Sequence, residues 1–447
     1  MKTILLSLAL IMVLNSLSQS ASYSDVAVIV NDNSQVSMDI ANYFQSERNI
    51  PSENMIHVLA PSTEIIDSIE FVQIRSQIES HLLNMPNVGS INYLVTTKGL
   101  PLKVDSSYMD NGVYSIKNAS FDSELSLILG PLSSSIGQNG ALNNPYYGDS
   151  MNFDRDSSGI FLVTRLDGYS KADVFALIDR SGPMKGLNKL SAKGIVDLNN
   201  ATASDSAFFA SQFMPAYDFF GANQWNSEID LHSDPYIQQD NVFSYLSIGH
   251  GPQPTTVYDN NWTEGAVGAM IMCSSAYTFD QDENSDDHCL VANLIADGCT
   301  GIIGYTDVFY FSQIWNSELF VERYFGNSGT FNLAESFYMA EKSLSWHSVV
   351  IGDPKASIMV DNFAEIIQPK LFNINLYPNP SNGVINIKST KMINSILVMD
   401  IQGSLVKNYS NQNGTSIKLD LSELESGIYF IQISSGNETI QKRVVVN

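Results

Sequence analysis

The sequence predicts an α/β protein with a mostly parallel sheet flanked by helices, followed by a small all-β sandwich of immunoglobulin-like type. From Asp25 onward, short β-rich runs alternate with segments of helical periodicity, which is typical of parallel α/β order. After Phe363 the pattern changes to short alternating segments separated by turn residues. The chain has 447 residues, 44% of them hydrophobic, and can therefore bury a full-sized core.

The α/β region divides into apolar runs and segments with apolar residues at helical spacing. The runs predicted as strands are residues 26–30, 55–59, 91–96, 160–164, 195–198, 242–248, 267–272 and 301–305. The predicted helices are residues 36–44, 71–83, 171–178, 204–213, 290–296, 314–324 and 333–344. A region rich in Ser, Asn and Gly at residues 132–150 predicts long surface loops.

The C-terminal region is broken by Pro369, Pro378 and Pro380 and then continues in short alternating segments. Closely spaced segments of this kind predict a small β-sandwich of roughly 75 residues. The segments predicted as strands are residues 384–387, 395–399, 416–419, 428–433 and 441–446.

The amino terminus has the pattern of a cleavable signal peptide. Lys2 precedes an apolar stretch at residues 4–14, and small serines follow, so we expect cleavage near residues 20–22. No later segment approaches ~18 uninterrupted apolar residues, which predicts a mature protein without a transmembrane span. The predicted organisation is a signal peptide (1–22), an N-terminal α/β subdomain (23–150), a catalytic α/β subdomain (151–362), a linker (363–373) and the sandwich (374–447).

The chain is strongly acidic, with 47 Asp and Glu against 23 Lys and Arg and a formal charge of -24. It contains no basic run that could neutralise a phosphate backbone, which argues against nucleic acid as a partner. The acidity suits an extracellular protein that must stay soluble, and its overall field would favour basic peptides.

The three cysteines are Cys273, Cys289 and Cys299. An odd number in an exported protein leaves at least one thiol outside an internal disulfide. Cys289 and Cys299 could form a bridge and leave Cys273 free. The alternative is three buried, reduced cysteines that act as small hydrophobic residues.

A histidine and a cysteine follow two successive predicted strands. His250 and Gly251 come after the strand at 242–248, and Cys273 comes after the strand at 267–272. In open parallel sheets the ligand crevice lies at the carboxyl ends of the strands, so the two side chains can face each other there. Their separation of 23 positions exceeds the ~10–12 that a parallel crossover requires.

This pair has the chemistry of a cysteine nucleophile and its acid–base partner. An imidazole stabilises a thiolate and later donates a proton to a leaving amine. The amides of Gly251 and Cys273 could form an oxyanion hole, because Gly251 allows close approach of a substrate. The plainer interpretation is a turn at His250 and a core residue at Cys273.

Several motifs support the interpretation of the pair as an enzyme active site. A strand ending in His-Gly, followed by a strand ending in Cys, resembles the clan of cysteine peptidases with a caspase-type sheet, which includes gingipains, legumains, separases and clostripain. Segments similar to gingipain catalytic domains are residues 162–168 (Leu-Val-Thr-Arg-Leu-Asp-Gly), 298–304 (Gly-Cys-Thr-Gly-Ile-Ile-Gly) and 351–355 (Ile-Gly-Asp-Pro-Lys). The N-terminal half also resembles an uncharacterised bacterial family through its motifs at residues 30–51 and at 93–102.

The resemblance implies a secreted or cell-surface cysteine endopeptidase that cleaves proteins or peptides through a thioester, with Cys273 as nucleophile and His250 as partner. It implies no required cofactor and no catalytic metal. The alternative is an inactive relative that uses the same sheet as a surface binding or adhesion module.

The C-terminal region resembles the type A sorting domain that Bacteroidetes use for type IX secretion. Its motifs are Leu-Tyr-Pro-Asn-Pro at 376–380, residues 400–403, Ser-Gly-Ile-Tyr-Phe at 426–430 and Lys-Arg-Val-Val-Val at 442–446. The resemblance implies export through the periplasm to the outer surface and an interaction with the secretion machinery.

An acidic stretch follows Cys273 and includes Asp280, Asp282 and Asp286. It begins like a calcium-binding loop, but Ser285 stands where the tight turn needs Gly and Val291 where a bidentate Glu is needed, so it is not an EF-hand. A looser structural calcium site stays open, and so does an ordinary solvated loop. The sharper prediction is that these carboxylates bind a Lys or Arg side chain of the substrate.

Overall fold

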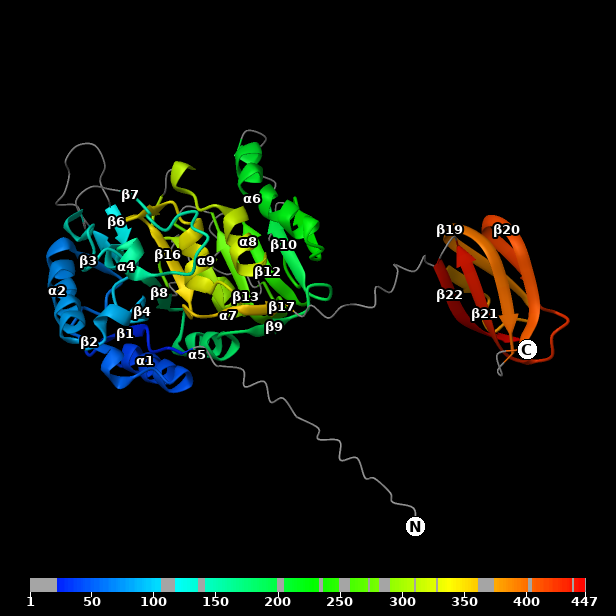
Figure 1. Ribbon diagram of the computed structural model, residues 1–447, viewed down its shortest axis with the longest axis horizontal. Helices are drawn as coiled ribbons and strands as arrows, with labels where there is room; N and C mark the ends of the chain where they lie inside the picture. The colour runs from blue at the N-terminus through cyan, green and yellow to red at the C-terminus, as the bar shows by residue number, and fades with distance from the viewer. Residues whose placement is uncertain are drawn as a thin grey trace, which may run out of the picture. The chain divides into compact units, whose positions relative to one another are not determined.

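The computed structural model describes most of the chain after the predicted signal peptide. The described residues are 22–105, 117–135, 141–198, 205–232, 236–248, 258–271, 274–280, 290–308, 311–326, 329–360, 374–400, 404–435 and 438–446. The chain forms two compact units, Met1–Asp361 and Asn362–Asn447, which are described separately (Figure 1).

A ten-stranded sheet forms the centre of the first unit, and most of its neighbouring strands are parallel. The strand β16 runs antiparallel to its neighbour β14. In spatial order the strands are β11 (Ser227–Asp230), β10 (Lys193–Asp197), β12 (Val242–Ser247), β13 (Trp262–Met270), β14 (Gly301–Tyr305), β16 (Ser348–Gly352), β8 (Leu162–Leu166), β4 (Tyr93–Thr97), β1 (Val26–Asn31) and β2 (Met55–Val58). The predicted α/β class with a mostly parallel sheet is confirmed.

The central strands are buried along their whole length, as expected for strands covered on both faces. This burial explains why the sequence there is mostly apolar without regular polar alternation, although β8 also contains the buried Arg165. Three small sheets accompany the large one: β3 (Ile65–Asp67) with β5 (Lys103–Asp105) and β6 (Lys117–Ser120), β7 (Leu142–Asn143) with β15 (Ser343–Leu344), and β9 (Lys185–Leu187) with β17 (Ile358–Val360).

Helices flank the sheet (Figure 1). They are α1 (Gln35–Arg48), α2 (Ser68–Asn84), α3 (Phe121–Leu125), α4 (Arg155–Ser158), α5 (Lys171–Arg180), α6 (Asp205–Ala222), α7 (Leu290–Asp297), α8 (Ser317–Gly326) and α9 (Leu333–Ala340). Helix α5 begins with a capping box between Ser170 and Asp173, and α9 with one between Asn332 and Glu335. Short 3₁₀ turns lie at Ser52–Asn54, Val88–Ser90, Ser133–Ser135 and Phe311–Gln313.

Several details of the predicted elements need correction, among them the helix predicted at 333–344, which ends at Ala340 as α9. The helix predicted at 204–213 continues as α6 to Ala222 through Pro215, because Ala216 and Phe220 keep the helical spacing and are buried. The strands β11 and β16 were not predicted. β16 pairs with β14 and β8, and its Val-Val-Ile run has the same apolar character as the predicted strands.

The region predicted as long surface loops is partly built into the core. Tyr146 is 1% exposed, and the Asn144 amide donates hydrogen bonds to the carbonyls of Tyr338 and Glu341, both at 2.8 Å. A segment rich in Ser, Asn and Gly can therefore pack inside when its polar groups find partners.

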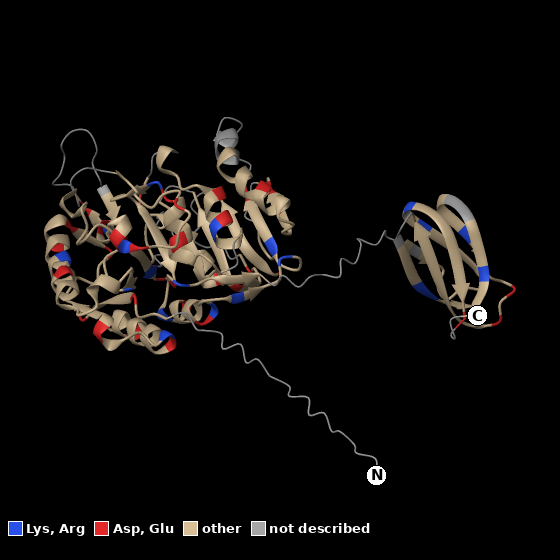
Figure 2. Ribbon diagram, in the orientation of Figure 1, with Lys and Arg blue, Asp and Glu red and all other residues tan. Residues whose placement is uncertain are grey.

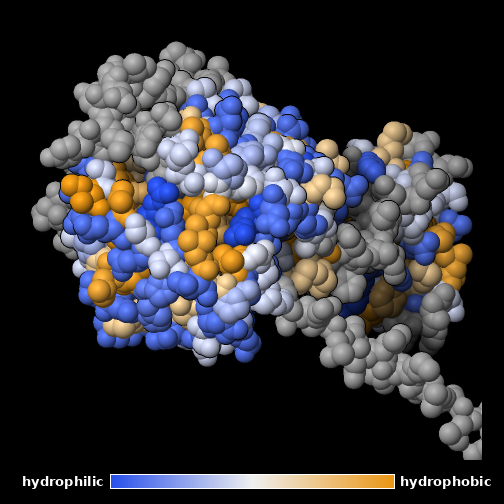
Figure 3. Space-filling view, turned by 60° about the vertical axis from the view of Figure 1, so that its left-hand side comes forward, coloured by the Kyte–Doolittle hydropathy of each residue, from blue (hydrophilic) through white to orange (hydrophobic). Residues whose placement is uncertain are grey.

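One apolar core runs through the first unit and joins residues of both predicted subdomains, from Tyr23 to Val360. Acidic and basic residues are interspersed on the outer helices α1 and α2 (Figure 2). On the face in Figure 3, apolar patches alternate with polar ones. Helix α2 contributes exposed apolar side chains, among them Ile69 and Leu83. Among the described helices, none has the length and hydropathy to span a bilayer.

The second unit is an antiparallel β domain, which confirms the predicted all-β class. Its strands are β18 (Ile374–Tyr377), β19 (Val384–Met399), β20 (Leu405–Asp420), β21 (Gly427–Ser435) and β22 (Glu438–Val446). Two segments predicted as separate strands merge into β19, which pairs with β18, β20 and β21. The Asn379 side chain fixes the Pro-Asn-Pro turn to β22, since it donates to the Arg443 carbonyl and accepts from the Val445 amide, both at 2.9 Å.

Candidate active site

The two strands that lead to the predicted dyad are parallel neighbours. Ser247 at the end of β12 pairs with Met270 at the end of β13, and the Ile271 amide donates to the Ser247 carbonyl at 3.0 Å. His250 and Cys273 each follow their strand partner by three positions. His250, Gly251 and Cys273 themselves lie outside the described residues, so the dyad stays a prediction while the neighbouring parallel strands that it requires are confirmed.

The chain after Cys273 is fixed to the end of β14. Ser274 has a positive φ of 59°, and its amide donates to the Asp307 carbonyl at 3.3 Å. The Ser275 hydroxyl donates to the Met270 carbonyl and accepts from the Tyr305 amide. A side chain on Gly304 would collide with Val291 and crowd Ser275, so the glycine permits this close approach.

Three charged side chains from the N-terminal part of the chain contact residues 277–280. Glu64 accepts hydrogen bonds from the Thr278 hydroxyl and the Phe279 amide, both at 2.6 Å. The Lys98 ammonium donates to the Phe279 carbonyl at 3.1 Å. The Lys103 ammonium donates to the Tyr277 carbonyl at 2.7 Å and lies 2.9 Å from the centre of the Tyr277 ring. We call Glu64, Lys98 and Lys103 the clamp.

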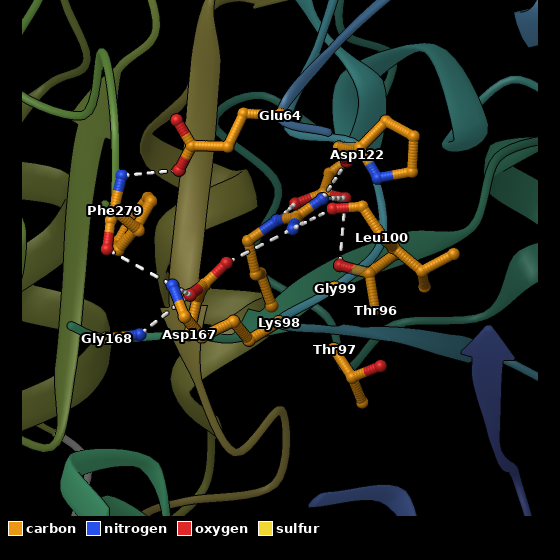
Figure 4. A network of polar contacts seen from close by, with 12 residues as sticks. Glu64, Thr96, Thr97, Lys98, Gly99, Leu100, Asp122, Asp167, Gly168 and Phe279 are labelled. Atoms are coloured by element: carbon orange, nitrogen blue, oxygen red, sulfur yellow. Dashed lines mark hydrogen bonds and ion pairs between the residues drawn. The ribbon is translucent and has the colours of Figure 1, made fainter. Parts of the chain in front are cut away.

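A buried arginine lies next to the clamp. Arg165, at 0% exposure, donates to both carboxylate oxygens of Asp122 at 2.8 and 2.9 Å and to Asp167 at 3.3 Å. Asp167 also accepts from Lys98, so one chain of polar contacts runs from Asp122 to Phe279 (Figure 4). The two charged partners make burial of the guanidinium tolerable, because an unpaired buried charge is strongly unfavourable.

The site's surroundings shift several pKa values. Burial opposes the charge of Arg165, but Asp122 and Asp167 outweigh it and raise the pKa of Arg165. For Lys98, burial likewise acts against the charge, and the nearby carboxylates of Asp167 and Asp280 leave its pKa raised. Burial also raises the pKa of Glu64.

Of the three carboxylates predicted to bind substrate, only Asp280 lies within the described residues. Asp280 is described, its side chain is 74% exposed, and its carboxylate lies 3.5 Å from the Lys98 ammonium. Asp282 and Asp286 lie outside the described residues. Within the described part of the chain, no group of three or more His, Cys, Asp or Glu residues is arranged to hold a metal ion.

Of the three cysteines, Cys299 lies within the described residues. Cys299 is a free, buried thiol 3.3 Å from the Gly301 carbonyl, so the disulfide with Cys289 that the sequence left open is not formed. Burial raises the pKa of Cys299 to about 12. The Cys299 thiol therefore stays protonated at neutral pH.

Sequence reasoning missed the clamp and Asp122. Lys98 and Asp167 directly follow the buried strands β4 and β8, and the rule that singled out His250 and Cys273 would have found them. Glu64 precedes the short strand β3 and Lys103 is the first residue of the short strand β5, so neither follows the end of a strand of the large sheet.

Comparison with known proteins identifies the second unit first. Residues 375–447 match the family model of the secretion system C-terminal sorting domain, as predicted. This domain marks the chain for secretion or cell-surface attachment by way of the periplasm and for interaction with the secretion machinery. No curated protein sequence matches the chain.

Three solved structures are similar to the chain over nearly its whole length. One is described as a protease, with 12% identity, coverage of 94% of this chain and 97% of that chain, and a TM-score of 0.40. The complex of the RgpB pro- and mature domains of Porphyromonas gingivalis has 14% identity, coverage of 94% and 100%, and a TM-score of 0.38. The Arg-specific cysteine proteinase gingipain R has 14% identity, coverage of 95% and 98%, and a TM-score of 0.39. These likenesses concern the fold alone.

Proposed function

We propose that the first unit is a secreted cysteine endopeptidase, with Cys273 as nucleophile and His250 as its acid–base partner. The observation that carries the proposal is the parallel pairing of β12 and β13, in register up to Ser247 and Met270. In the sequence, His250 and Cys273 each come three positions after these last paired residues, and we infer that both lie at the carboxyl edge of the sheet.

The proposed reaction is acyl transfer through a thioester. The Cys273 thiolate attacks the carbonyl carbon of the substrate, and the resulting oxyanion accepts hydrogen bonds from the amides of Gly251 and Cys273. When the C–N bond breaks, the leaving amine takes a proton from the His250 imidazolium. Water, deprotonated by His250, then hydrolyses the thioester and releases the acid.

The acidic residues Asp280, Asp282 and Asp286 are proposed to bind a basic side chain of the substrate. An ion pair to a Lys or Arg would be supported by the acidity of the chain as a whole. A structural calcium site in the same stretch is the alternative that the sequence left open. Thermal stability measured during calcium titration tests the ion, since a bound cation raises the melting temperature.

The decisive experiment is peptide cleavage by the protein without its signal and sorting segments, compared with the Cys273→Ala and His250→Ala variants. We expect cleavage after basic residues in the unmodified protein and a loss of at least about a thousandfold in both variants. Activity that survives Cys273→Ala would end the proposed mechanism. An inert unmodified protein would favour the alternative, an inactive relative that serves as a surface binding or adhesion protein.

A further inference from the structure

The segment after the predicted nucleophile is held from two directions. Residues 274–276 are bonded to the end of β14 and to Asp307. Residues 277–280 are bonded to the clamp, whose members come from three separate places in the first 105 residues. The Cys273 position therefore begins a segment whose other end is fixed by the N-terminal part of the chain.

The clamp consists of charged side chains, although neutral side chains would be sufficient if they were needed only to pack against residues 277–280. Lys103 is 1% exposed, and the side chain of Lys98 is 17% exposed. Such partly or fully desolvated charges are costly unless their partners are fixed in good geometry, and once paired they hold those partners firmly. The partners here include the backbone carbonyls of Tyr277 and Phe279 and the backbone amide of Phe279.

The clamp is also connected to the buried ion pairs of the sheet. Lys98 and Arg165 share Asp167, and Arg165 is bound in turn to Asp122 (Figure 4). The ion pair with Asp167 therefore holds the Lys98 ammonium in place, so that it can donate a hydrogen bond to Phe279 in a fixed geometry.

We propose that Glu64, Lys98 and Lys103 are positioning residues for Cys273, through which the N-terminal part of the chain orients the nucleophile's segment. The inference rests on the proposed peptidase function. It adds that reactivity at Cys273 depends on residues more than 150 positions away in the sequence. Loss of the clamp lets residues 277–280 move, and misplacement of a reacting group by about 1 Å can reduce a rate roughly a hundredfold.

The test is the rate of alkylation of Cys273 by iodoacetamide in the full-length mature protein, with the modified residue identified by mass spectrometry. We expect Lys98→Met and Glu64→Ala to slow this reaction about tenfold or more. The midpoint of the rate against pH should also move upward, toward the ~8.5 of free cysteine, because the proposed contact with His250 would be weakened. Glu64→Gln keeps an oxygen that can accept from Phe279 and should restore most of the rate.

Two further variants separate positioning from folding. Thr278→Val removes the hydroxyl that donates to Glu64 without changing the size of the side chain, and a severalfold slower reaction is expected. Lys193→Met is the matched control, since Lys193 is similarly exposed and paired with Glu228 but lies at the amino end of β10. The control should react at the unmodified rate with the same pH midpoint.

The outcomes distinguish this inference from the proposed function. A reactive Cys273 whose rate and pH midpoint are unchanged in folded Lys98→Met and Thr278→Val proteins overturns the clamp alone. An unmodified protein that cleaves no peptide and whose Cys273 reacts as slowly as free cysteine overturns both proposals.

Discussion

The two units of the chain treat buried charge in opposite ways. The first unit buries charged side chains that include Lys103, Asp122 and Arg165. In the described residues of the sorting domain the buried core is aliphatic, and the buried polar side chains are Ser381 and Ser435. The comparison indicates that apolar packing is sufficient to stabilise the sorting domain. The first unit, in contrast, buries charges beside its candidate site, and each buried charge lowers its stability unless it is paired.

The tryptophans make the comparison measurable. Trp225, Trp262, Trp315 and Trp346 account for all four tryptophans of the chain and lie in the first unit. Tryptophan fluorescence therefore reports unfolding of the first unit alone, while calorimetry reports both units.

The largest effect is expected at Arg165. Arg165→Met leaves the buried carboxylates of Asp122 and Asp167 without their main partner, and we expect the first unit to lose about 3–5 kcal/mol. Arg165→Lys keeps the charge but loses the two-pronged contact, so a smaller loss is expected. Denaturant unfolding followed by tryptophan fluorescence measures both. Equal stability of all three proteins would show that these ion pairs are not what makes the buried arginine tolerable.

A pH effect is expected from Glu341. Its side chain is buried, and burial raises its pKa to about 8, well above its value in an unfolded chain. The folded state therefore holds the proton more tightly than the unfolded chain does, and the stability of the first unit should fall by about 3 kcal/mol as the pH rises from about 6 to 9. Glu341→Gln should flatten this dependence in the fluorescence-detected unfolding. If Glu341→Gln keeps the pH dependence of the unmodified protein, another titrating group causes it.

The apolar core of the sorting domain predicts a local effect. Ile396 is fully buried in that core, and Ile396→Val should cost the sorting domain about 0.5–1.5 kcal/mol. Calorimetry should show a lower transition for the sorting domain and an unchanged transition by tryptophan fluorescence. A shift in the fluorescence transition would contradict the separation into two independent units.

The smallest effect is expected at Asn379. Asn379→Ala removes two hydrogen bonds to the backbone of β22 at an exposed site, at a cost of about 0.5–1 kcal/mol. Hydrogen exchange should detect it as faster exchange of the Val445 amide, with Asn386→Ala as a control on β19. Unchanged exchange at Val445 would mean that the turn is held by other contacts.

The arrangement of the strands could be predicted because each strand's own residues carry the signal. The strands β1, β4, β12 and β14 are buried along their whole length and appear in the sequence as mostly hydrophobic stretches. The placement of His250 and Cys273 after adjacent strands followed from the same pattern. β16 (Ser-Val-Val-Ile-Gly) has a similar apolar, β-branched run, and the same rule applied to residues 348–352 would have found it.

The clamp could not be predicted because it depends on contacts between distant segments. Glu64 and Phe279 are 215 positions apart, and Lys103 and Tyr277 are 174 apart. A single Lys or Glu in a sequence is most often a solvated surface residue, and only the folded chain reveals that Lys103 is almost fully buried.

The central claim is that His250 activates Cys273, and competitive labelling of the three cysteines in the folded protein tests it most directly. We expect a thiol-directed probe to label Cys273 first and His250→Ala to slow that labelling strongly. Cys299 should stay unlabelled, because burial raises its pKa to about 12. Equal, slow labelling of all the cysteines, or a rate at Cys273 that ignores His250→Ala, would contradict the account.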